Sequence, residues 1–142
     1  MKKILFLFIL TTSTIVYSQN ENNEDKQGEP FNKSSNLLNE IHDILKQSYA
    51  YGHKSLIREN DSLIHVNKNG ARKIHLKDID ASSIEVKLED SYYRVIIKCK
   101  YGNKKMIADW GNYNTFGFPL KVERHAEEVA YKFKQYLSQF NF

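Results

Sequence analysis

Residues 92–101, YYRVIIKCKY, form the stretch of sequence that decides the fold. Two sets of side chains alternate along it. The first set is mostly apolar and consists of Tyr93, Val95, Ile97, Cys99 and Tyr101. The second set is mostly basic and consists of Arg94, Ile96, Lys98 and Lys100. Successive side chains of a strand point to opposite faces. The stretch therefore predicts an antiparallel strand with one face in the core and the other mostly in water.

The period of two continues on both sides of this stretch, from residue 53 to residue 110. It predicts further strands at residues 54–58, 62–66, 72–76, 84–89 and 104–110. The segments between them are rich in Gly, Asn and Asp, which favour tight turns. Short connections favour antiparallel neighbours. We therefore expect an antiparallel meander of about six strands, closed into a small barrel or bent into a curved sheet.

Two amphipathic helices are predicted, one on each side of the strands. In residues 34–51, large apolar residues recur at three- and four-residue spacing, and Gly52 follows as a terminating residue. Residues 122–140 carry a second apolar stripe, made of Ala126, Val129, Ala130, Phe133, Leu137 and Phe140. The predicted fold class is α+β, with an N-terminal helix, the strands and a C-terminal capping helix.

An aromatic segment precedes the last helix. Its large rings are Trp110, Tyr113, Phe116 and Phe118, and residues 111–119 are predicted to be a loop. Large apolar groups in such a place either plug the end of a small barrel or form an exposed contact patch. The plug is the favoured interpretation, because several exposed rings without a partner promote association. The patch remains open, and it makes these four residues candidates for partner contact.

A basic set of side chains is the second candidate site. It consists of Arg72, Lys73, Lys77, Arg94, Lys98, Lys100, Lys104 and Lys105. A solvated face is the usual explanation for such a set. The alternative is a surface for an anionic ligand, with Arg94, Lys98 and Lys100 as contacts. The full chain has a net charge of +4, which is too small to indicate a nucleic-acid partner.

The N-terminus is typical of a secretory signal. Lys2 and Lys3 precede an apolar run, and a Thr/Ser-rich exit ends in Tyr17-Ser18. We expect residues 1–18 to be a cleaved signal peptide, residues 19–33 a flexible polar linker, and residues 34–142 a single domain. The mature protein would be periplasmic or secreted, without a transmembrane segment.

Mass spectrometry of the exported protein should find Gln19 as its first residue, and an intact Met1 terminus would contradict cleavage.

The residues that commonly carry chemistry form no known motif. The five histidines lack the close spacing of a zinc helix or finger, so neither a metal site nor a cofactor is predicted. His65 and His75 could meet across a hairpin, but scattered solvated histidines are the favoured interpretation. Asp78 and Asp80 are best explained by a solvated turn. The single cysteine, Cys99, is predicted to be a buried thiol.

The order of these signals resembles the second half of a pleckstrin-homology-like domain. The resemblance rests on IHLKDIDASSIEVKLEDSYYRVIIKCKYGNKKMIADW followed by PLKVERHAEEVAYKFKQYL, and it covers residues 54–140. It implies a binding scaffold and a helix that caps a small barrel. The helix at residues 34–51 is extra to that family. A cystatin-like fold, with one sheet wrapped around this helix, is the runner-up. The Ser18-Gln19 junction and the Lys/Asn/Ile-rich composition resemble exported proteins of Bacteroidetes.

The predicted function is an exported, non-catalytic binding or adaptor domain. Its partner would be another protein or an anionic surface ligand, and it would be a monomer or a weak dimer. The alternative is a small enzyme or an enzyme inhibitor acting in the periplasm or outside the cell. In the enzyme, Asp78, Asp80, His65 or His75 would be the acid–base groups.

Overall fold

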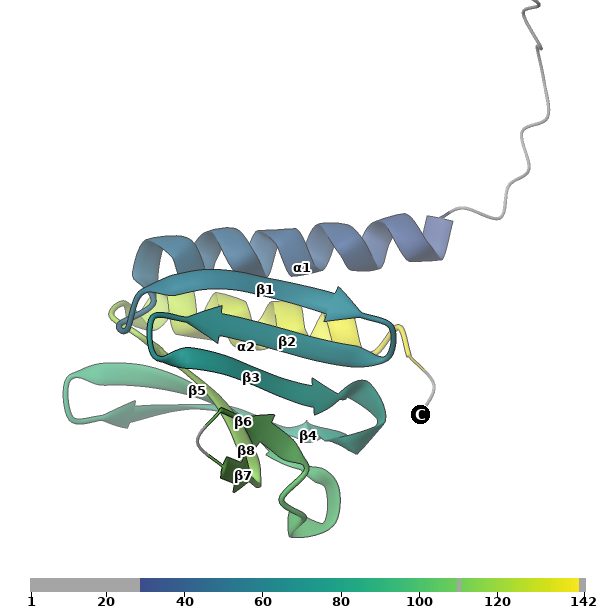
Figure 1. Ribbon diagram of the computed structural model, residues 1–142. Helices are drawn as coiled ribbons and strands as arrows, with labels where there is room; N and C mark the ends of the chain where they lie inside the picture. Colours follow the sequence, from purple (N-terminus) through teal and green to yellow (C-terminus); the bar gives the residue numbers. More distant parts are fainter. Residues whose placement is uncertain (1–28, 110, 141–142) are drawn as a thin grey trace, which may run out of the picture.

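Two helices lie side by side over two antiparallel sheets in the computed structural model of the chain (Figure 1). The structure describes residues 29–109 and 111–140. The predicted signal peptide, its cleavage site and Trp110 lie outside the described residues. No helix in the described part of the chain is long and apolar enough to cross a membrane.

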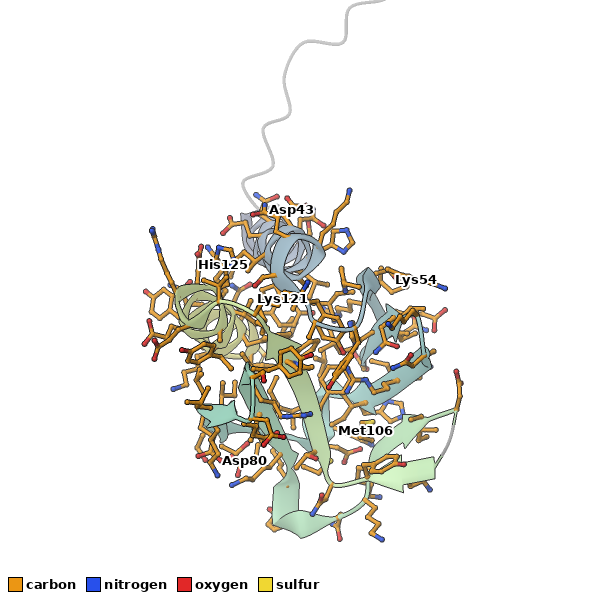
Figure 2. The ribbon with its side chains drawn as sticks, turned by 90° about the vertical axis from the view of Figure 1, so that its left-hand side faces the viewer. Asp43, Lys54, Asp80, Met106, Lys121 and His125 are labelled. Atoms are coloured by element: carbon orange, nitrogen blue, oxygen red, sulfur yellow. The ribbon has the colours of Figure 1, made fainter. Side chains whose placement is uncertain are left out.

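Helix α1 spans Glu29–Ser48 and helix α2 spans Glu123–Leu137. Both predicted helices are confirmed, although α1 begins five residues before the expected Ser34. Pro30 in its first turn is compatible with this start, because the first N–H groups of a helix have no intrahelical partner. The helices contact each other, and Lys132 of α2 donates to the Glu40 carboxylate of α1 at 2.5 Å. Figure 2 shows the pair nearly end-on above the sheets.

The first sheet has five strands in the order β1-β2-β3-β6-β7. Its strands are β1 (His53–Glu59), β2 (Ser62–Asn67), β3 (Gly70–His75), β6 (Met106–Ala108) and β7 (Gly111–Tyr113). The hairpins β1–β2 and β2–β3 were predicted. The pairing of β3 with β6 was not predicted, because the paired residues are about 35 positions apart in the chain.

The second sheet has three strands in the order β4-β5-β8. They are β4 (Ile79–Glu89), β5 (Tyr92–Cys99) and β8 (Thr115–Leu120). The prediction of a loop over residues 111–119 is therefore wrong, because this segment forms β7 and β8. The long strand β5 supplies the missing partner: its backbone pairs with β8 from Tyr93–Leu120 to Lys98–Thr115.

The two sheets are open, so the predicted closed barrel is wrong for the described residues. The chain leaves the first sheet at the 3-10 turn η1 (Leu76–Asp78), whose Leu76 is buried. That turn directs β4 into the second sheet, and β3 pairs with β6 instead. The meander is therefore only partial. The cystatin-like alternative also differs, because the strands divide between two sheets and α2 packs against α1.

The core lies between the helices and the two sheets. On β5, Val95, Ile97 and Cys99 are buried, which confirms the predicted core face and the buried thiol. Tyr101 departs from that face, since β5 ends at Cys99 and the Tyr101 side chain is 93% exposed. Phe118 of β8 stacks on Phe133 of α2, with ring centroids 5.2 Å apart.

Candidate functional site

A cleft of about 370 Å³ is lined by residues from both sheets. The first sheet contributes one residue from each of β3, β6 and β7, and the second contributes residues of β4, β5 and β8. The lining residues are Arg72, Glu89, Arg94, Ile96, Met106, Tyr113, Thr115 and Gly117. Figure 2 labels Met106, which marks the β6 side of this cleft. We call it the arginine cleft, because the basic groups among its described lining residues are Arg72 and Arg94.

Arg72 lines the cleft and contacts four neighbours. Its Nη2 donates to the Tyr49 hydroxyl at 3.0 Å and to Nδ1 of His65 at 2.7 Å. Its guanidinium carbon lies 5.2 Å from the centroid of the Phe116 ring and 5.8 Å from that of Phe118. At these distances the ring faces attract a cation. The side chain is thus fixed in place.

The charge of Arg72 has no carboxylate partner among the described residues. Its Nε is buried and has no hydrogen-bond partner there either. Burial is the main cause that lowers the pKa of Arg72, Tyr49 opposes this effect, and the nearby positive charge of Arg94 lowers the pKa further. Removing a charge from water without pairing it is costly, and charges withdrawn from water in proteins are usually paired.

Arg94 is the second cation of the cleft, and it is partly neutralised. Its Nε donates to the Glu89 carboxylate at 2.5 Å. Gly117 lies beneath its side chain, and a Cβ at that position would stand 3.5 Å from Cδ of Arg94. That distance is an ordinary van der Waals contact, so the Arg94 side chain lies directly against β8 at this glycine. Two arginines therefore meet one carboxylate, and the cleft has a positive excess.

Three histidines continue from Arg72 toward α1, and we call them the histidine chain. Nε2 of His65 lies 3.1 Å from Nδ1 of His53, and Nε2 of His53 lies 2.8 Å from Nδ1 of His42. Burial lowers the pKa of His65 to about 2, aided by the charges of Arg72 and His53. Burial, and then the charge of His42, lowers the pKa of His53 to about 4. Both rings are neutral at neutral pH.

The structure brings together only part of the predicted contact set. Arg94 and Tyr113 line the arginine cleft. Phe116 and Phe118 are fully buried, so their rings plug the core beneath Arg72 and cannot form an exposed patch.

The two predicted lysine contacts lie elsewhere. Lys98 is exposed and its Nζ lies 3.3 Å from the Glu85 carboxylate. Lys100 lies in the turn η2 (Lys100–Gly102) after β5, outside the cleft lining.

The histidine chain is the feature that the sequence interpretation missed. His65 is fully buried, so the prediction of scattered solvated histidines is wrong for this ring. A signal was present: Leu63, His65 and Asn67 alternate with less buried residues and share the core face of β2. The period of two placed His65 inside. Its contacts with α1 and β1 depend on packing between elements distant in sequence.

The residues proposed as acid–base groups of an enzyme do not form one site. The Asp80 carboxylate accepts from the backbone and hydroxyl of Ser82, as in a local turn. His75 meets Ser62 instead of His65, with Nδ1 and Oγ 2.9 Å apart. These two are directly opposite on β3 and β2, and Ser62 is buried, so its hydroxyl is not presented to a substrate.

A larger hollow of about 710 Å³ lies along α1 and β1. Its walls include Leu38, Leu56 and Tyr136. Its charged residues, Arg58 and Asp61, form an ion pair at 3.6 Å. This hollow therefore lacks the uncompensated charge of the arginine cleft.

Comparisons with family models, with curated proteins and with solved structures gave no match to this chain. The pleckstrin-homology resemblance therefore stays a prediction. Within residues 29–109 and 111–140, no group of three or more His, Cys, Asp or Glu side chains is arranged to hold a metal ion.

Proposed function

We propose that this protein is an exported, non-catalytic binding domain that holds a small ligand by an oxyanion group in the arginine cleft. The oxyanion is a carboxylate, sulfate or phosphate. These groups match the planar N–H donors of a guanidinium, which can bind them through two parallel hydrogen bonds. Tyr113, Met106 and Ile96 supply the less polar walls that contact the rest of the ligand.

One observation carries this proposal: Arg72 is a partly buried cation whose Nε is fully buried, and it has no carboxylate partner among the described residues. Its Nη2 is used by Tyr49 and His65, while the buried Nε–H remains unpaired. An anion that enters the cleft would lie beside the Arg72 guanidinium and compensate its charge. The export part of the proposal rests on the signal-like pattern of residues 1–18.

The first test is a titration with sulfate, phosphate and acetate at constant ionic strength, followed by amide NMR. We expect saturable shifts at Met106, Thr115 and Gly117 for at least one of the three anions. The anion that saturates at the lowest concentration identifies the preferred group. Shifts that grow linearly with every salt and spread over all surface lysines would contradict a specific site.

Two cleft variants should change affinity in opposite directions. Arg94→Gln removes a charged donor, and hydrogen bonds to charged groups contribute about 1.5–3 kcal/mol, so affinity should fall by about tenfold or more. Glu89→Gln removes the competing carboxylate and should raise affinity. Lys98→Gln is the matched control, because it removes the same charge from β5 outside the cleft. An equal loss of affinity in Lys98→Gln would show that the effect of Arg94→Gln comes only from the change in net charge.

A further inference from the structure

The hydrogen bonds of the histidine chain all donate in one direction, and Arg72 sets that direction. A guanidinium can only donate, so Nδ1 of His65 must accept from Arg72. The proton of neutral His65 is then on Nε2, which donates to Nδ1 of His53. By the same logic, Nε2 of His53 carries a proton and donates to Nδ1 of His42. All three rings are therefore held as neutral Nε2–H tautomers.

The histidine chain cannot accept another proton without losing a hydrogen bond while Arg72 keeps its present contacts. Protonating any ring turns an acceptor nitrogen into a donor that faces another N–H group. The first such conflict arises between His42 and His53, whose nitrogens are 2.8 Å apart. An added proton therefore requires that a ring turns or that Arg72 loosens its hold on His65.

Arg72 is the charged group that contacts the histidine chain directly. Helix α1 contributes His42, and Tyr49 directly follows its end. Strand β1 contributes His53, β2 contributes His65 and Asn67, and β3 contributes Arg72. Strand β8 contributes the rings of Phe116 and Phe118. Arg94 of β5 acts on Arg72 through its charge. Among the described residues, no carboxylate bonds to any of the three rings.

An anion in the cleft would change this balance. The positive charge of Arg72 is one of the causes that keep His65 neutral. An oxyanion bound to Arg72 would cancel much of that charge and favour a proton on the chain. Linkage between two sites is reciprocal, so a proton on the chain must favour the anion by the same factor.

We propose that anion binding in the arginine cleft is coupled to proton uptake by the histidine chain, so that the domain holds its ligand more tightly as the pH falls. This inference rests on the proposed function, because it requires an anion at Arg72. His42 is the outermost ring of the histidine chain and is partly exposed to solvent.

Sulfate is the probe for the test, because it keeps its charge between pH 5.5 and 7.5. Its affinity is measured at both pH values by calorimetry at constant ionic strength, in two buffers of different ionisation enthalpy. For the natural chain we expect about fivefold or more tighter binding at pH 5.5 and net proton uptake.

His53→Gln should remove both the pH effect and the proton uptake, because an amide can accept and donate hydrogen bonds but cannot titrate. His42→Gln provides the same test at the outer end of the chain, should the His53 variant fail to fold. His75→Gln is the matched control on the exposed part of β3, and it should behave like the natural chain.

The outcomes separate the two proposals. Equal sulfate affinity at both pH values, without proton uptake, would overturn the coupling and leave the binding function standing. A pH effect that persists in both His53→Gln and His42→Gln would also overturn it. If no tested anion binds in the cleft, the proposed function fails and the coupling fails with it.

Discussion

Phe133→Ala should lower the free energy of unfolding by about 3–5 kcal/mol, because truncating a buried Phe loses transfer free energy and leaves a cavity. Phe133 is fully buried on α2 and stacks on Phe118 of β8. A domain of this size has only about 5–15 kcal/mol of stability in total. The urea denaturation midpoint should therefore fall sharply, as measured by circular dichroism.

Lys134→Ala is the control for this substitution. The neighbouring Lys134 side chain is exposed on the opposite side of α2, so its removal should barely move the midpoint. Equal midpoints for the two variants would contradict the core position of Phe133. Such a result would instead favour a helix whose apolar stripe binds a partner.

Acidification should destabilise the protein through the histidine chain. In the unfolded state the two inner rings protonate near pH 6.5, but in the folded state the pKa is about 2 for His65 and about 4 for His53. Their stabilising contribution is complete above about pH 6.5 and is lost as the pH falls toward the folded values. Between pH 6.5 and 4.5, His65 alone should account for about 2 kcal/mol. Half-buried His53 adds less, because solvent screens it.

The measurement is urea unfolding at pH 7.0 and pH 4.5 for three proteins. Carboxylates also titrate in this range, so the informative quantity is the difference between each variant and the natural chain. His65→Gln should lose about 2 kcal/mol of the pH dependence. His75→Gln, outside the chain, should retain it. An unchanged pH dependence in His65→Gln would show that His65 does not stay neutral on acidification.

The local sequence pattern was sufficient to predict most of the helices and strands. The alternation around β5 predicted its buried face, and the helical stripe of α2 predicted the burial of Phe133. The segment of β8, Thr115–Leu120, was misinterpreted as a loop because Gly117 and Pro119 break regularity in an isolated chain. Pairing with β5 overrides that local preference, since β8 is an edge strand of its sheet, where proline is tolerated.

The candidate site was predictable only in fragments. Arg94 and Tyr113 were singled out from the sequence, and both line the cleft. Arg72 was one member of a larger basic set, and nothing in its immediate sequence marks its charge as unpaired. Its environment is set by Tyr49 after α1, by His65 on β2 and by Phe116 on β8, which no local pattern relates to β3.

The sequence by itself determined the α+β class, the two amphipathic helices and the inward faces of the main strands, because period and turn chemistry are local properties of the chain. Only the tertiary structure decided that the strands divide into two open sheets, that Arg72 lies partly buried without a counter-ion among the described residues, and that three histidines align in one hydrogen-bonded chain. The physical reason is that these features arise from burial and charge contacts between segments far apart in sequence, where packing sets the environment of each side chain.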